Sequence, residues 1–343
     1  MSVTPYISGD SATFLWQGAA PPQLIGDFNG WDATQAPQFE PDGPDRWTFR
    51  LQLPEDAYIE YIYLLNEGVH TLDPGNPRRV SNGYLKYNNY FYMPEAAPSP
   101  WVRRRPNTPR GRLSQHELPA YPPFLQSSLT APYSRRKIYL YQPPVDTPCP
   151  LVLVFDGKDY LRHARLPTLL DNLIRARRIR PLAAALVSNG GPLRFFEYNC
   201  SDLTLNFIQE QVLPLAQEHL NLLDIEREPG SYGVMGASMG GLMAMYSAFR
   251  MPQVFGSVLS QSGAFSPRSV IFDLVKLQAG LQINLWMDVG RLERLLEGNQ
   301  VFHELLVSQG YAVGFKVFSA AHNYTAWRDD LAHGLEHLFG TRP

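Results

Sequence analysis

Residues 231–246 read SYGVMGASMGGLMAMY, an apolar run, a glycine-rich turn and a second apolar run. The runs predict a strand followed by a helix. In the turn, Gly236 and Gly240 flank Ser238 in the pattern G-x-S-x-G. This pattern needs a strand–turn–helix context, because the serine sits on a strained turn with its hydroxyl exposed at the carboxyl edge of a sheet. The stretch therefore predicts Ser238 as a nucleophile, with glycines where a Cβ would collide with the neighbouring strand or helix.

Apolar runs of the same kind continue on both sides of this stretch. They alternate with helical patterns, and continuous apolar strands that alternate with helices indicate a mostly parallel sheet covered on both faces. Together with the G-x-S-x-G turn, this predicts an α/β fold of the α/β-hydrolase type. The expected strands are 137–141, 151–155, 182–187, 233–235 and 283–287, and the helical patterns are 203–220 and 299–309.

The N-terminal part of the chain has a different pattern. From residue 11 to about residue 93, the apolar residues come in short alternating runs closed by Gly, Pro, Asn or Asp, which is typical of a small all-β sandwich. Residues 94–111 then concentrate proline and arginine, which keeps a backbone extended. The expected domains are a β-sandwich at 1–95, a Pro/Arg linker at 96–111 and a hydrolase domain at 112–343.

The composition favours a small, neutral ligand. The chain of 343 residues carries a net charge of −2 and has a pI near 6.5, whereas a nucleic-acid-binding surface needs concentrated basic residues. The arginines at 103–105 stand beside prolines, which is typical of a solvated linker. Cys149 and Cys200 are the only cysteines, too few for a disulfide framework, and both are expected to be reduced. We therefore expect no nucleic-acid partner.

The sequence also gives no reason to expect a membrane partner. It contains no stretch of about 18 apolar residues, and it does not start with a basic region followed by a long apolar run. A cytoplasmic protein is the expectation. The predicted chemistry needs neither a metal ion nor a cofactor, and nothing in the sequence specifies an oligomeric state.

A serine hydroxyl becomes a nucleophile only when a base takes its proton, and the negative oxygen formed on the substrate needs donors aimed at it. The backbone N–H of Met239, first in the predicted helix, is one candidate donor. The second is expected from the loop after the strand at 151–155, where the turn at 156–158 points to the N–H of Lys158.

The base and the acid should follow the serine in the order acid, then histidine, on loops at the carboxyl ends of later strands. His322 meets this requirement, since it follows a predicted strand at 313–318 and precedes a helix that starts near Thr325. Asp288 and Glu293 both follow the strand at 283–287. Either carboxylate could hold the imidazole tautomer and stabilise its positive form, so both remain candidates on this reasoning.

Several further motifs resemble the bacterial enterochelin (enterobactin) esterases and related trilactone hydrolases of the esterase D group. The stretches GDFNGWD at 26–32 and LDPGNP at 72–77 resemble that family's N-terminal domain, which is immunoglobulin-like and related to glycogen-binding modules. Other stretches resemble the family's catalytic domain: FDG at 155–157, RFFE at 194–197, GASMGG at 236–241, FGSVLSQSG at 255–263 and His322 followed by Trp327 and Arg328.

The resemblance implies roles for single residues. It places Ser238 on the nucleophile, His322 on the base and Glu293, in GRLE at 290–293, on the triad acid. Arg194 and Glu197 match an Arg-x-x-Glu element near the family's site, where Arg194 either meets an anionic or catechol-bearing substrate or forms a structural ion pair. The matching motifs also imply substrate-binding positions at Arg194, Gly157 and Trp327.

The chain departs from the family at two places that the resemblance puts at the pocket wall. Relatives carry Gly-Gly-His where this chain has Ala320, Ala321 and His322, and an aromatic pair where it has Ser266 and Pro267. These departures concern the identity of the substrate more than the chemistry.

Three functions are compatible with these patterns. The first is hydrolysis of a siderophore-type trilactone, in which iron enters only as part of a ferric substrate. The second is a carbohydrate esterase that removes feruloyl or acetyl groups, with Trp31 and Trp47 either stacking sugars or filling the sandwich core. His70 stands where sugar binders often have a second tryptophan, which weakens this interpretation. The third is a catalytically silent hydrolase that only binds a ligand or partner.

Overall fold

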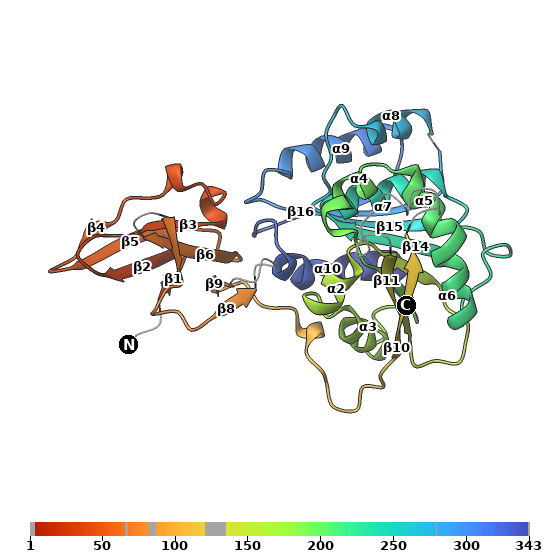
Figure 1. Cartoon of the computed structure of the whole chain (residues 1–343), viewed down its shortest axis with the longest axis horizontal. Coiled ribbons are helices and arrows are strands. Elements are labelled where there is room, and N and C mark those ends of the chain that lie inside the picture. Colours follow the sequence, from red (N-terminus) through yellow and green to blue (C-terminus); the bar gives the residue numbers. More distant parts are fainter. Residues whose placement is uncertain (1–3, 66–67, 82–86, 121–134, 279, 342–343) are drawn as a thin grey trace. The chain divides into compact units, whose positions relative to one another are not determined.

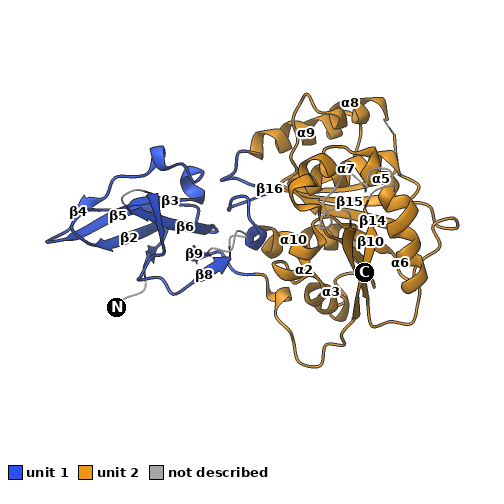
Figure 2. Ribbon diagram, in the orientation of Figure 1, with its two compact units in different colours: residues 1–98, 290–294, 317–326 blue, residues 99–289, 295–316, 327–343 orange. Residues whose placement is uncertain are grey.

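The computed structural model describes residues 4–65, 68–81, 87–120, 135–278 and 280–341. These residues belong to two compact units (Figure 2). Unit 1 combines residues 1–98 with two short segments from late in the chain, 290–294 and 317–326. Unit 2 consists of residues 99–289, 295–316 and 327–343.

The N-terminal part of unit 1 is built from two antiparallel sheets, as its alternating pattern predicts. The first sheet has the order β1-β2-β5-β4, and the second has the order β3-β6-β9-β8 with β7 also paired to β6. The strands are β1 (Tyr6–Ser8), β2 (Ser11–Gln17), β3 (Gln23–Gly26), β4 (Glu40–Pro41), β5 (Arg46–Gln52), β6 (Tyr58–Leu65), β7 (Val69–Thr71), β8 (Arg79–Ser81) and β9 (Tyr87–Tyr92), with the 3₁₀ turns η1 (Asp27–Asn29) and η2 (Ala33–Gln35) after β3.

Aromatic rings fill the core of this β-sandwich. Successive side chains of a strand point to opposite faces, and on β6 the alternate residues Tyr61 and Tyr63 join one buried cluster with Phe14 and Phe91. Phe14 meets Tyr61 edge-on, with ring centroids 5.0 Å apart. Ile62 points to the other face of β6 and belongs to a second, smaller cluster. Both faces of β6 are therefore buried.

Unit 2 is organised around an eight-stranded sheet of order β10-β11-β13-β12-β14-β15-β16-β17. Strands β10 and β11 are antiparallel, and pairing is parallel from β13 through β16. Figure 1 shows helices on both sides of this sheet. The strands are β10 (Arg112–Pro119), β11 (Arg135–Gln142), β12 (Leu151–Val154), β13 (Ala183–Val187), β14 (Tyr232–Ala237), β15 (Phe255–Gln261), β16 (Asn284–Gly290) and β17 (Val313–Phe318).

The two faces of the sheet have different helices against them. On one face, α7 (Met239–Arg250) packs against β14 and β15. On the other, α10 (Tyr324–Phe339) comes so close that a Cβ added at Gly233 of β14 would lie 2.6 Å from the ring of Phe339. The remaining helices are α2 (Gly157–Arg162), α3 (Leu166–Arg175), α4 (Arg194–Tyr198), α5 (Asp202–Phe207), α6 (Leu213–His219), α8 (Val270–Leu277) and α9 (Leu296–Ser308), with shorter turns η4 (Pro100–Val102), η6 (Gly191–Leu193) and the π-helical η7 (Ile208–Val212).

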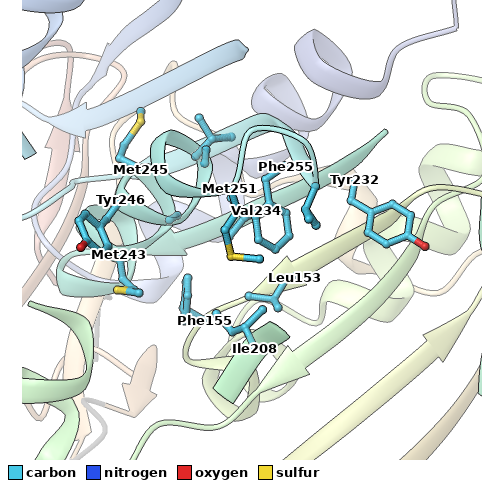
Figure 3. Packing of buried hydrophobic residues seen from close by; sticks show 14 of the residues in the cluster. Leu153, Phe155, Ile208, Tyr232, Val234, Met243, Met245, Tyr246, Met251 and Phe255 are labelled. Carbon is cyan, nitrogen blue, oxygen red and sulfur yellow. The ribbon is translucent and has the colours of Figure 1, made fainter. Parts of the chain in front are cut away.

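The main hydrophobic core lies on the α7 face of the sheet (Figure 3). Leu153 of β12 and Val234 of β14 contribute from the sheet, and Met243 contributes from α7. All three side chains are at most 1% exposed. This core holds the strand and the helix that join at Ser238.

The observed architecture confirms the expected fold class. The expected strands are present, while the helical pattern at 203–220 is divided into α5, η7 and α6. The antiparallel strand β10, which carries His116, has no counterpart among the expected strands. Cys149 and Cys200 are not bonded to each other. Within the described ranges, every helix is too short or too polar to cross a bilayer.

Shortening a side chain in this core should destabilise unit 2. Leu153 is fully buried, so Leu153→Ala removes apolar contacts and leaves a cavity, and we expect the free energy of unfolding to fall by about 2–5 kcal/mol. Denaturation with urea, followed by tryptophan fluorescence, measures this change. The control is Leu277→Ala, because Leu277 is 83% exposed; equal losses for the two variants would contradict the assigned core.

Candidate active site

Ser238 occupies the sharp turn between β14 and α7. Its backbone has φ 58° and ψ −123°, a strained conformation for a residue with a side chain. Three backbone hydrogen bonds hold the turn: the Ser238 N–H donates to Gln261 at 2.9 Å, and the Ser238 carbonyl accepts from Leu242 at 3.1 Å and from Ala264 at 3.0 Å. Such strain is kept only where surrounding structure enforces it, and it is common at functional sites.

The glycines around Ser238 allow this turn to pack tightly. A Cβ added at Gly236 would lie 2.5 Å from the backbone carbonyl of Gly240. A Cβ at Gly240 would lie 3.1 Å from the carboxylate of Asp156 and 3.2 Å from the Cβ of Phe155. The turn that carries Ser238 is therefore in direct contact with the turn that follows β12.

Two helices start at these neighbouring turns. Met239 is the first residue of α7, and Lys158 is the second residue of α2. The first N–H groups of a helix have no acceptor within the helix, and β12 and β14 are adjacent parallel strands, so both helix starts lie at the same edge of the sheet. This is the placement that oxyanion donors need, and the donor roles of Met239 and Lys158 stay predictions.

Gly157 lets α2 approach the neighbouring strand. A Cβ at this residue would lie 2.2 Å from the backbone of Leu186 in β13. The close approach explains the glycine by packing, and a contact of Gly157 with substrate stays a prediction.

His322 and Glu293 are hydrogen-bonded to each other within unit 1, His322 Nδ1 donating to Glu293 Oε2. The other carboxylate oxygen of Glu293 accepts from the N–H of Gly290 at 2.7 Å. The Glu293 side chain is 2% exposed and that of His322 is 36% exposed. A carboxylate at Nδ1 selects the tautomer in which Nε2 can accept a proton. The geometry suits a general base with its orienting acid.

Asp288 has a different environment. It is fully buried, and its Oδ2 accepts hydrogen bonds from Trp286 Nε1 at 3.0 Å and from Gln261 Nε2 at 3.3 Å. Burial and the nearby charge of Asp330 raise the pKa of Asp288 well above its usual range. A carboxyl group with a raised pKa is poorly suited to stabilise an imidazolium, because that role needs its charged form. Of the two candidate acids, Glu293 is the one that the structure pairs with His322.

Arg194 and Glu197 form two separate ion pairs. Arg194 donates from Nε and Nη2 to the carboxylate of Asp156, at 2.8 and 2.6 Å, and Nη2 also reaches the carbonyl of Ala237 at 3.3 Å. Glu197 pairs with the buried Arg136. Both residues therefore form structural ion pairs. Arg194 links the turn after β12 to Ala237, the residue before Ser238. A contact of Arg194 with substrate stays a prediction.

Asp156 is a central residue that sequence reasoning did not single out. It is 1% exposed, has a left-handed φ of 54°, and also accepts from Asn189 Nδ2 at 2.6 Å. Its own N–H donates to the Tyr198 hydroxyl at 3.1 Å. The FDG motif contained the signal, since a charged residue directly after a buried strand needs partners.

Trp327 lies inside unit 2. The side chain is buried, its Nε1 donates to Ser262 Oγ at 2.9 Å, and its carbonyl accepts from Gln261 Nε2 at 3.0 Å. These contacts hold the start of α10 against the end of β15. Its proposed contact with substrate stays a prediction.

The predicted residues are thus gathered in two groups. Ser238, Met239 and Lys158 belong to unit 2, and Glu293 and His322 belong to unit 1. Among the residues with described positions, no group of three or more His, Cys, Asp or Glu side chains is arranged to hold a metal ion.

Comparison with known proteins decides the family. The sequence model of the Esterase family, described as "Putative esterase", matches residues 130–338. The chain belongs to this family. The enterobactin esterase resemblance carried by the sequence motifs is confirmed by homologues and by solved structures.

Among curated relatives, the iron(III) enterobactin esterase of Dickeya dadantii (strain 3937) is 28% identical over 228 residues, which cover 60% of this chain and 52% of that protein. The iron(III) salmochelin esterase of Escherichia coli O6:H1 is 26% identical over 231 residues, covering 60% and 54%. The chain thus spans about half the length of these relatives. The uncharacterised protein YbbA of Bacillus subtilis (strain 168) is 26% identical, and the match covers 67% of this chain and 97% of YbbA.

Solved structures share the fold over almost the whole chain. The ferric enterobactin esterase of Salmonella typhimurium matches with a TM-score of 0.78 at 18% identity, covering 95% of this chain and 93% of that one. The ferulic acid esterase of Anaeromyces mucronatus matches with a TM-score of 0.58 at 17% identity, covering 71% and 96%. At these identities the likeness concerns the fold.

The raised pKa of Asp288 predicts a pH dependence of stability. A carboxyl group whose pKa is raised in the folded state stabilises the fold most below its unfolded pKa, and this contribution is lost as the pH rises. Relative to Asp288→Asn, the wild type should therefore lose up to about 1.4 kcal/mol of unfolding free energy per pH unit above a pH of about 4. The asparagine oxygen can still accept from Trp286 and Gln261. Urea unfolding from pH 4 to 8 measures this, and parallel curves would refute it.

Proposed function

We propose that this protein is a serine hydrolase of carboxylic esters. The observation that carries the proposal is the strained, glycine-flanked turn at Ser238 in a member of the Esterase family. In the proposed reaction, His322 Nε2 takes the proton of Ser238 Oγ while Oγ attacks the ester carbonyl. The Met239 and Lys158 N–H groups stabilise the resulting oxyanion.

The remaining steps return the enzyme to its starting state. The protonated imidazole of His322, stabilised by the Glu293 carboxylate, gives its proton to the leaving alcohol as the carbon–oxygen bond breaks, which leaves an acyl group on Ser238. Water then gives a proton to His322 and attacks the acyl carbonyl. The carboxylic acid leaves and Oγ recovers its proton. These reaction steps require no metal ion or cofactor.

The proposed substrate is a siderophore-type trilactone, handled by a cytoplasmic enzyme. Support comes from curated relatives named iron(III) enterobactin and iron(III) salmochelin esterases. Iron is then cargo of the substrate and not a resident of the protein. A trilactone carries three equivalent ester bonds, so one nucleophile can open the ring and act again on the linear product.

The carbohydrate-esterase alternative depends on exposed aromatic rings in the β-sandwich. Trp31 is half-buried and donates from Nε1 to Asp27 at 3.0 Å, and Trp47 is half-buried and donates to the carbonyl of Gly18 at 2.9 Å. Both indoles therefore serve the packing of the sandwich. This favours the trilactone over a sugar ester. The panel of esters described next also tests the silent-hydrolase alternative.

Substrate class and chemistry can be tested with one panel. We expect wild type to hydrolyse ferric or iron-free triscatechol trilactones faster than feruloyl sugars, acetyl sugars and p-nitrophenyl esters. Ser238→Ala should lose at least about 10³-fold in turnover, because the covalent route is removed. Liquid chromatography with mass spectrometry follows the products. Hydrolysis of none of these esters, or full activity of Ser238→Ala, would rule out the proposal.

The identity of the acid can be tested with two isosteric changes. Glu293→Gln should lower kcat by about 10²- to 10⁴-fold, because an amide cannot orient the imidazole in the same tautomer or stabilise its positive form. Asp288→Asn should stay within about threefold of wild type, because the asparagine oxygen can still accept from Trp286 and Gln261. Steady-state kinetics on a p-nitrophenyl ester measure both, and equal losses would contradict the assignment of Glu293.

A further inference from the structure

The proposed acid and base lie on two loops that group with the β-sandwich. The loop at 290–294 follows β16 and carries Glu293, and the loop at 317–326 includes the end of β17 and carries His322. Both strands belong to the sheet of unit 2, yet both loops cluster in unit 1 (Figure 2). The chain therefore brings these two loops to the sandwich.

The two loops are first tied to each other. The N–H of Arg291 donates to the carbonyl of Phe318 at 2.9 Å, and the N–H of Leu292 donates to the carbonyl of Ala320 at 3.1 Å. A Cβ at Gly290 would lie 2.3 Å from the Ala320 carbonyl oxygen. These backbone contacts bracket the hydrogen bond between Glu293 and His322.

The loops are then attached to the sandwich by backbone and by side chains. The N–H of Tyr58, the first residue of β6, donates to the carbonyl of Ser319 at 3.0 Å. The side chain of Leu292 packs against the aromatic cluster of the sandwich. The buried Tyr58 hydroxyl donates to Glu60 Oε1 at 3.1 Å and is hydrogen-bonded by the side chain of Thr325. Each loop thus has its own anchor in the sandwich.

A buried polar cluster lies beneath these anchors. Asp27 of the GDFNGWD motif accepts from the N–H of Glu60 at 2.8 Å and from Trp31 Nε1 at 3.0 Å, and Glu60 Oε2 accepts from Asn88 Nδ2 at 2.8 Å. Burial and the charge of Glu60 raise the pKa of Asp27 well above its usual range, with a smaller contribution from Glu293.

We propose that the β-sandwich is a positioning element for the acid–base pair, with Tyr58 and Leu292 as the positioning residues. This inference rests on the proposed function. A general base works only within hydrogen-bond reach of the proton that it takes, and a misplacement of about 1 Å costs about 10²-fold in rate. A loop with anchors on both sides of the Glu293–His322 bond keeps the imidazole in place between turnovers.

A positioning role of Tyr58 and Leu292 and a purely structural role predict different kinetics. If Tyr58 and Leu292 only hold unit 1 together, their variants lose stability but keep kcat. If they position His322, kcat falls while KM is unchanged, because the reacting geometry is lost and not the binding of the ester.

The experiment uses the full-length chain and two matched pairs of variants. Leu292→Ala removes the apolar anchor. Tyr58→Phe removes the hydroxyl that meets Glu60 and Thr325 and keeps the backbone bond to Ser319. Tyr63→Phe and Leu24→Ala make the same changes at buried positions of the sandwich core. Tyr63 is five residues further along β6, about 16 Å from Tyr58 along the strand. Leu24 lies opposite Tyr63 on β3. Leu292→Met serves as the conservative rescue.

We measure kcat, KM and the pH profile of kcat/KM on a p-nitrophenyl ester, and the thermal midpoint of each variant. The expected result is a fall in kcat of about 10-fold for Tyr58→Phe and about 10- to 100-fold for Leu292→Ala, with KM within about twofold of wild type. The pKa of the basic group in the pH profile should shift in these variants. Leu292→Met should recover most of kcat, and the controls should keep it.

Two outcomes separate the failure of this inference from the failure of the proposed function. If Ser238→Ala and His322→Ala are inactive while the anchor variants keep kcat like their controls, the sandwich does not position the pair and the inference is wrong. If Ser238→Ala or His322→Ala keeps wild-type kcat, the serine mechanism itself is wrong. If Leu292→Ala does not fold, the smaller truncation Leu292→Val decides, because it shortens the same apolar anchor by one methylene group.

Discussion

The close packing at Ser238 is the constraint on which the rest of the site depends. The turn has no room for side chains at Gly236, because the backbone of Gly240 occupies the space where a Cβ would lie. With that space closed, the serine itself takes a backbone conformation with positive φ, and its strain is offset by the buried strand before it and the helix after it. Any residue larger than glycine at 236 would have to open the turn.

A buried ion pair joins this turn to its neighbour. Arg194 reaches both Asp156 and the carbonyl of Ala237, so the two helix starts that would supply oxyanion donors are coupled by one guanidinium. Asp156 is almost completely buried, and removing Arg194 would leave its carboxylate without its charged partner, which costs several kcal/mol in such sites. Arg194 therefore stabilises the turns whatever it contributes to substrate binding.

The sequence was most informative where patterns are local. The strands and the turn at Ser238 follow from hydrophobic periodicity and glycine spacing, and the fold class was predicted correctly on that basis. The order of acid and histidine follows from that fold class. Hydrophobic periodicity could not decide between Asp288 and Glu293 as the acid, because the two carboxylates differ in which distant residues surround them. The attachment of the loops at 290–294 and 317–326 to the sandwich was also hidden, since Tyr58 and Ser319 are separated by most of the chain.

Asp288 and Glu293 are close together in sequence, but their side chains have different surroundings. Asp288 has donors from Trp286 and Gln261 on one oxygen only, and burial together with the charge of Asp330 raises its pKa well above the usual range. Glu293, five residues later, accepts from a backbone N–H on one oxygen and from the imidazole of His322 on the other. The chain must therefore leave the sheet before its acid meets the imidazole, and a loop that leaves the sheet needs a second support. The sandwich meets that need through Leu292, the residue directly before the acid, so the same departure that makes Glu293 usable makes the N-terminal part of the chain necessary for its placement.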